Sequence, residues 1–110
     1  MVRAEPSLRV LFDRLDEAFQ SKVRIGIVSA LMGAGSLDFK TLKTALDLTD
    51  GNLSSHVAYL ERRGFVIVSK SFLGKRPHTE ITLSDEGRLG FRQYIDALDA
   101  IVTAAKESHA

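Results

Sequence analysis

The sequence contains no cysteine, and this absence excludes several kinds of protein at once. Without thiols the chain has no disulfide framework, no thiolate metal site and no cysteine nucleophile. It also lacks any apolar run near the roughly 18 residues that a membrane-spanning helix needs. Charged residues interrupt the first twenty positions, so they contain no signal-peptide core. We therefore expect a cytoplasmic protein that has no membrane partner.

Motifs of catalysis are missing as well. The chain has no HExxH, P-loop or GxGxxG pattern, and no motif pairs His56 or His78 with a nucleophile. Two histidines without ligand spacing are a poor basis for a metal site. The glycine cluster Gly33–Ser36 follows no strand pattern and indicates a turn. We expect no catalytic residue, no metal and no cofactor.

The distribution of charge says more than its sum. The 110 residues are 45% hydrophobic and 26% charged, which predicts one ordinary globular domain over residues 1–110. The net charge is only +1, but five bases and no acid lie between Arg62 and Thr79. From Ser84 onward, five acids face three bases. This asymmetry indicates that the basic central segment offers a surface to a polyanion, whereas the mildly acidic C-terminal segment offers a surface to a different kind of partner.

Apolar residues at helical spacing predict two helices in the first third of the chain. The first lies within residues 1–20 and starts near Pro6 and Ser7. Its apolar stripe comprises Leu8, Leu11, Phe12, Leu15 and Phe19. Ser21 caps the second helix, which the glycines at 33 and 35 end.

Residues 38–64 have the pattern of a helix-turn-helix. Asp38 caps a short helix, Asp47-Leu48 turns the chain, and Thr49 caps the next helix. In that helix the apolar positions lie at i, i+4 and i+7, and Gly64 ends it. Two short helices joined by about three residues have the spacing of a helix-turn-helix.

The pattern then changes to strands over residues 65–83. Phe65–Val68 and Thr79–Leu83 are the two predicted strands, and a basic loop, Ser71–Pro77, joins them. Ser84 caps a final helix over residues 84–107. An apolar seam of heptad spacing follows along it, at Phe91, Ile95, Leu98, Val102 and Ala105.

This order of elements resembles the winged-helix regulators of the MarR and ArsR type, and most closely the small stand-alone winged helix DNA-binding domains. Residues 48–66, Gly74–Thr79 and Ile81–Arg88 carry the resemblance, which covers roughly residues 23–94. It implies a mainly α fold with a small β-hairpin wing. It also implies additional N- and C-terminal helices that serve dimerisation.

A recognition helix must pack one face and present short polar groups on the other. The side opposite Leu53 is small or polar, although Ser54-Ser55 near a helix start also fits plain capping chemistry. His56 projects about 60° from the buried axis. The basic hairpin is either a DNA contact or a solvated loop, and the resemblance implies the first. The candidate DNA-binding residues are Asn52, Ser54, Ser55, His56, Tyr59 and Arg62 from the helix and Lys70, Lys75 and Arg76 from the wing.

The terminal helices are the candidate dimer interface. The seam of the last helix must be covered either by the first helix of the same chain or by a second copy, and we favour a homodimer that reads two half-sites. The candidate interface residues are Leu8, Leu11, Phe12, Leu15, Phe91, Ile95, Leu98 and Val102.

We therefore predict a transcription regulator that binds specific sequences of double-stranded DNA. Its recognition helix would enter the major groove, and its basic wing would contact the backbone or minor groove. The alternative is a winged-helix module for protein interaction or assembly, because the fold alone does not guarantee DNA binding. MarR-like relatives often bind small aromatic effectors, so the resemblance adds a small-molecule effector of unknown identity.

Overall fold

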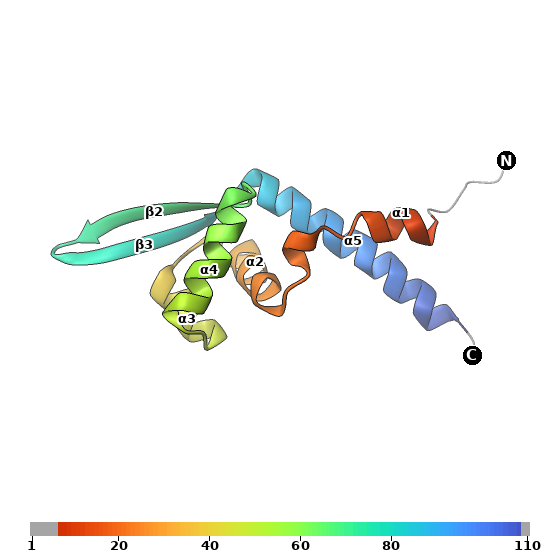
Figure 1. Ribbon diagram of the computed structural model, residues 1–110, viewed down its shortest axis with the longest axis horizontal. Helices are drawn as coiled ribbons and strands as arrows, with labels where there is room; N and C mark the ends of the chain where they lie inside the picture. Colours follow the sequence, from red (N-terminus) through yellow and green to blue (C-terminus); the bar gives the residue numbers. More distant parts are fainter. Residues whose placement is uncertain (1–6, 109–110) are drawn as a thin grey trace.

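The computed structural model describes residues 7–108 of the chain. Its elements are α1 (Leu8–Asp13), the 3₁₀ turn η1 (Glu17–Phe19), α2 (Lys22–Ala34), β1 (Ser36–Asp38), α3 (Phe39–Leu46), α4 (Asp50–Arg62), β2 (Val66–Leu73), β3 (Arg76–Leu83) and α5 (Asp85–Glu107). The predicted architecture, mainly α with a small β-hairpin wing and flanking terminal helices, is confirmed (Figure 1).

Side-chain caps determine where four of the helices begin. Each cap accepts a hydrogen bond from the backbone N–H three residues later, which satisfies one of the free donors of a helix start. All four residues were predicted as caps from the sequence: Ser21, Asp38, Thr49 and Ser84. The capping chemistry of the sequence is therefore confirmed.

Helix α2 lies at the centre of the core and packs against α3, α4, α5, β1 and β3. Its buried side chains meet one face each of α3 and α4. Removing such a side chain from water is worth roughly 1.5–3 kcal/mol. The largest fully buried side chains are Phe19, Ile27, Leu31, Leu42, Leu53, Leu60, Ile81 and Val28.

The three strands form an antiparallel sheet in the order β1-β3-β2. Strand β1 was not predicted, because three residues after a glycine are too few to show a period. It pairs Ser36 with Thr82 and Asp38 with Glu80. The N–H of Leu83 also donates to the carbonyl of Gly35 at 3.0 Å. The root of the hairpin is thus joined to the segment between α2 and α3.

The hairpin corrects the prediction of a long loop at Ser71–Pro77. Both strands continue into that segment, and only Gly74 and Lys75 form the turn. Gly74 has φ 65°, and a glycine with positive φ at this first central position is typical of a type II′ hairpin turn. Pro77 lies within β3, opposite Phe72. It is tolerated because β1 pairs only with residues 80–82, so β3 is an edge strand at this height.

The N-terminal helix is shorter than the predicted span of residues 1–20. It begins where expected, after Ser7, whose Oγ accepts from the N–H of Val10 at 3.2 Å and caps the helix. Residues 1–6, with the predicted position of Pro6, lie outside the described residues. Helix α1 ends at Asp13. Asp16 then accepts from the N–H of Ala18 at 2.9 Å and starts the separate turn η1. An aspartate that bonds its own backbone in this way competes with the helix.

This break moves Phe19 from the predicted stripe into the core. Its ring centroid lies 5.2 Å from that of Phe65 in a stacked arrangement, 5.2 Å from that of Phe91 edge-on, and 5.5 Å from that of Tyr94. Phe91 is only 4% exposed. The structure therefore moves Phe91 from the predicted dimer interface to the core of its own chain, because the first turns of α5 cross that core.

The molecule is elongated. Its principal extents are 65 × 29 × 21 Å, and its radius of gyration is 17.0 Å, against about 13 Å for a compact domain of ~100 residues. The wing projects at one end and the C-terminal part of α5 at the other (Figure 1). Among residues 7–108, no helix has the length and apolar character needed to cross a membrane.

Gly87 is the tightest point of the fold. A Cβ on this buried glycine would overlap the carbonyl oxygen of Phe65, where the wing root meets the first turn of α5. We expect Gly87→Ala to lower the free energy of unfolding by at least about 2 kcal/mol, as overpacking does. Urea denaturation followed by circular dichroism measures this.

Gly33→Ala is the matched control. This helical glycine has nothing within 4 Å of its added Cβ, so the substitution should be neutral or stabilise by up to about 1 kcal/mol. Equal stability of the two variants would contradict the close contact at Gly87.

Candidate nucleic-acid interface

Helix α4 is held through its connection to α3. Asp47 adopts the left-handed conformation, with φ 52°, which reverses the chain after α3. Across the turn, Nζ of Lys43 lies 2.8 Å from Oδ1 of Asp50, in the first turn of α4. The apolar face of α4 is buried in the core, so its opposite face is directed outward.

The outward face of α4 is lined by short polar or absent side chains. The structure leaves Asn52, Ser54 and Ser55 exposed near the start of the helix, and Arg62 exposed at its end. Gly51 is exposed between them, and Ala58 is partly exposed. Such a face allows close approach to base edges, which hydroxyl and amide groups can bond. We call these residues (51, 52, 54, 55, 58 and 62) the polar face.

His56 and Tyr59 do not belong to the polar face. They lie on the flank of α4 that meets Arg24 of α2. Nη1 of Arg24 lies 3.1 Å from Nδ1 of His56, and its Cζ lies 4.2 Å from the centroid of the Tyr59 ring. Because an arginine only donates, Nδ1 of His56 is the acceptor and the ring is neutral. Any role of His56 and Tyr59 in contacting DNA remains a prediction.

Arg24 also ties α4 to the turn η1. Its Nε donates to the carbonyl of Ala18 at 2.7 Å, and Nη2 donates to the carbonyl of Glu17 at 3.3 Å. Partial burial lowers the pKa of His56, and the charge of Arg24 lowers it further. The guanidinium of Arg24 thus both favours the neutral imidazole of His56 and holds α4 against η1.

A second arginine reinforces this flank. Arg63 donates to the hydroxyl of Tyr59 at 3.2 Å and to Oδ2 of Asp16 at 2.8 Å. Burial alone would raise the pKa of Asp16, but the hydrogen bonds from Arg63 and the N–H of Ala18, with the charge of Arg63, hold it below its usual value. The end of α4 is therefore attached to the segment that leads back to α1.

The wing presents its cations to solvent. Lys70 lies on β2, Lys75 in the turn and Arg76 at the start of β3, and all three are exposed. Within residues 7–108 these three, and Arg62 of the polar face, make no ion pair with an acid. Four exposed cations without an acidic partner, spread from the end of α4 to the tip of the wing, give this side of the molecule a positive charge that favours a polyanion.

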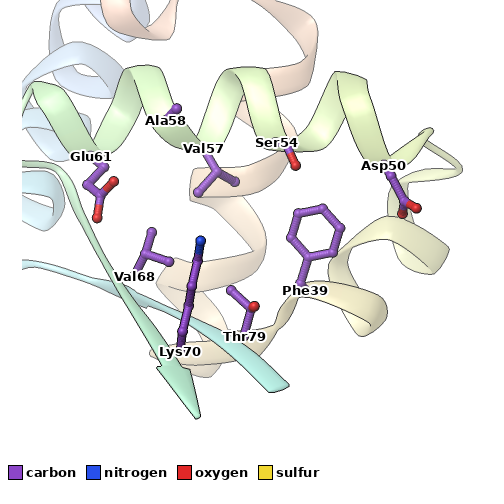
Figure 2. A pocket seen from close by; sticks show the side chains of 9 residues that line it. All are labelled: Phe39, Asp50, Ser54, Val57, Ala58, Glu61, Val68, Lys70 and Thr79. Carbon is purple, nitrogen blue, oxygen red and sulfur yellow. The ribbon is translucent and has the colours of Figure 1, made fainter. Parts of the chain in front are cut away.

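An open hollow of about 920 Å³ separates α4 from the wing. Figure 2 shows Lys70 reaching from β2 toward α4, with Val68 beside it and Glu61 near the far end of the hollow. The hollow shows that the polar face and the wing are neighbours. Its lining comprises Phe39, Asp50, Ser54, Val57, Ala58, Glu61, Val68, Lys70 and Thr79.

Sequence reasoning missed Arg24 and Glu61. Nothing near Arg24 in the sequence signals its partner, because His56 lies 32 residues away. Helical spacing could have placed Glu61 on the same side of α4 as Ser54 and Val57, because it follows them by seven and four residues. Among the described residues, no group of three or more histidine and acidic side chains could hold a metal ion.

Comparisons with known proteins agree with this geometry. A family described as "Winged helix DNA-binding domain" matches residues 23–102. A curated, uncharacterized protein of Methanocaldococcus jannaschii is 43% identical over 77 residues, which is 70% of this chain and 84% of that protein.

Two solved structures are similar to this chain. A transcriptional regulator homologue from Pyrococcus horikoshii OT3 superposes with a TM-score of 0.79 at 30% identity, over 86% of this chain and 95% of that one. The YusO protein of Bacillus subtilis has a TM-score of 0.71 at 15% identity, over 88% and 71% of the two chains, and so shows the fold alone. The predicted resemblance to winged-helix regulators is confirmed.

The contact between Arg24 and His56 predicts a measurable shift. Arg24→Gln removes a positive charge beside the imidazole, so the pKa of His56 should rise toward its ordinary value of about 6.5, while the effect of burial remains. Titration of the His56 ring protons by NMR measures it. Lys22→Gln, which removes the same charge from an exposed position on α2, should leave that pKa unchanged.

The lowered pKa of His56, which burial and the charge of Arg24 cause together, determines the sign of a pH effect on stability. The folded pKa of His56 is lower than the unfolded pKa. The contribution of His56 to the free energy of unfolding is therefore complete above about pH 6.5 and is lost as the pH falls through the lowered pKa.

For the titration experiment, a pKa of His56 that does not respond to Arg24→Gln would contradict the contact between the two residues.

Proposed function

Because this chain belongs to the winged helix DNA-binding domain family, we propose that it is a transcription regulator that binds specific sequences of double-stranded DNA as a homodimer. In this proposal α4 is the recognition helix and lies in the major groove. The β2–β3 hairpin is the wing and contacts the backbone or the adjacent minor groove.

One observation carries the proposal: the polar face of α4 adjoins a wing whose cations are unpaired. The small side chains at positions 51, 55 and 58 allow a groove floor to approach α4. Asn52, Ser54 and Ser55 offer donors and acceptors to base edges, and Arg62 suits a phosphate. Lys75 and Arg76 supply the salt-dependent attraction to the backbone.

The homodimer is supported by apolar surface at the far end of the molecule. Leu8 and Phe12 of α1 are 70% and 65% exposed, although Leu11 is buried. An apolar hollow lies between α1 and α5, and its lining includes Leu8, Phe12, Leu15 and Ile101. A second copy seated here would cover it and would place two recognition helices on one duplex.

The seam of α5 is only partly covered within the described chain. Val102 follows Phe91 by eleven residues and so lies on nearly the same side of the helix, at 100° per residue. Phe91 is in the core and Leu98 is partly buried. Val102 is exposed where α5 extends beyond the core, whereas Ile95 is exposed because it lies on the flank of α5, away from its buried neighbours Tyr94 and Ala97. The proposed interface is therefore the outer part of the predicted seam together with Leu8, Phe12 and Leu15.

Selection of bound duplexes from a random DNA pool tests the function directly. We expect an enriched site with two inverted half-sites whose centres are about 10 base pairs, or a multiple of that, apart. Failure to enrich any sequence, together with no binding to random DNA at low salt, would show that the fold serves another purpose here, such as protein interaction.

The contribution of the wing is tested with a matched pair of lysines. Lys75→Ala should weaken binding to all sequences and reduce the slope of log K against log salt by about one, because one phosphate contact is lost. Lys106→Ala removes the same charge from the last turn of α5 and should change neither quantity. Fluorescence anisotropy over a salt series measures both. Equal slopes for the two variants would exclude Lys75 from the interface.

The dimer is tested by placing a charge at its proposed centre. Val102→Asp should give a folded monomer, because a carboxylate is costly to bury in an apolar interface. Light scattering measures the mass, and circular dichroism confirms the helix content. Leu73→Asp, at an apolar position of similar or greater exposure in the wing, should leave the dimer intact. A Val102→Asp protein of dimer mass would place the interface elsewhere.

A small-molecule effector remains a prediction from the family resemblance.

A further inference from the structure

The wing carries an exposed aromatic ring that the proposed function leaves unused. Phe72, the second residue before the turn, is 71% exposed, more than any other large hydrophobic residue of the described chain. Phe19 and Phe91, by contrast, are buried. Leu73 is also exposed, but it follows Phe72 directly in β2 and so points to the other side of the hairpin, which leaves Phe72 as the single candidate wedge at the basic tip.

The register of the hairpin shows which way Phe72 points. Side chains alternate along a strand, so Phe72 lies on the same side of β2 as Lys70 and Val68, and Pro77 opposite it lies on that side too. Figure 2 shows that Lys70 and Val68 point toward α4. Phe72 therefore lies on the side of the wing that faces the recognition helix, but near the turn, beyond the hollow.

The surroundings of Phe72 favour a nucleic acid over a protein partner. The chain has no acid between Glu61 and Glu80, while Lys70 lies on the same side of β2 as Phe72, and Lys75 and Arg76 follow Phe72 by three and four residues. Phe72 and Leu73, on opposite sides of the hairpin, form no patch large enough for a stable protein interface, which buries about 800 Å² per partner. Phosphates can pair with the three cations, and an aromatic ring can stack on the bases of a duplex.

The wing is long enough for such a contact. Eight residues of β2 span roughly 26 Å at ~3.3 Å per residue. The minor groove next to the major groove that holds α4 lies about half a DNA turn away, or roughly 17 Å. The two-residue turn keeps the tip narrow, and Pro77 opposite Phe72 restricts the backbone there.

We propose that Phe72 inserts between neighbouring base pairs from the minor groove and kinks the duplex, while Lys75 and Arg76 hold the flanking phosphates. This inference rests on the proposed DNA binding and adds an activity to it, the deformation of DNA. Apolar wedges of this kind partly unstack one base step and bend DNA by about 20–90°. Flexible pyrimidine–purine steps would then be preferred under the tip, which gives specificity without base contacts.

The experiment uses a duplex selected from the random pool, with a donor and an acceptor dye at its two ends. Wild-type protein should shorten the end-to-end distance by the amount that a bend of about 20–90° produces. Phe72→Ala should lose most of this change, and Phe72→Leu should retain part of it. Ile67→Ala, which truncates an exposed apolar residue of β2 on the other side of the hairpin, should bend DNA like the wild type.

A second readout reports on the base step itself. 2-Aminopurine placed under the wing tip should become several-fold brighter on binding of wild type, but not of Phe72→Ala, because only a wedge unstacks it. If wild type binds but the duplex stays straight, or if Phe72→Ala bends the duplex equally, the insertion of Phe72 is refuted while the proposed DNA binding is not. If wild type binds no duplex at all, the proposed function itself fails.

Discussion

The side chain of Phe19 joins the parts of this molecule that would otherwise be separate. Its ring packs on Phe65 at the root of the wing and on Phe91 and Tyr94 of α5, while η1 connects it to α1. The proposed DNA-binding surface and the proposed dimer surface lie at opposite ends of a 65 Å molecule, so their relative position depends on this contact. Aromatic pairs with such geometry add to the free energy of burial.

Hydrogen bonds of Ser84 join three elements at the same point. The hydroxyl of Ser84 donates to the carbonyl of Gly64 at 2.6 Å, and its N–H donates to the carbonyl of Phe65 at 3.1 Å. The end of α4, the start of β2 and the start of α5 therefore meet within a few residues. Arg24 and Arg63 hold the other flank of α4 to η1.

The sequence predicted what local chemistry determines and failed where distant residues decide. Caps at Ser21, Thr49 and Ser84 depend on a side chain and a backbone N–H three residues later, so they were found. The break after α1, the strand β1 and the burial of Phe91 depend on packing that periodicity does not contain. The position of His56 depends on Arg24, 32 residues away. In the hairpin, Gly74 and Pro77 suggested a loop, whereas the pairing of the strands leaves only two residues for the turn.

In the proposed interface, the distribution of charge gives α4 and the wing different kinds of interaction with DNA. The polar face of α4 carries a single cation, Arg62, so α4 contributes little long-range attraction and mostly directional hydrogen bonds. The wing cations supply the attraction, which is insensitive to sequence. Glu61, in the hollow between them, has no cation paired with it among the described residues and would repel a phosphate placed there. In the proposed complex the strongest attraction would therefore lie at the tip of the wing, while in the hollow Glu61 would oppose the attraction of Lys70, and this would restrict the orientations in which α4 could enter a groove.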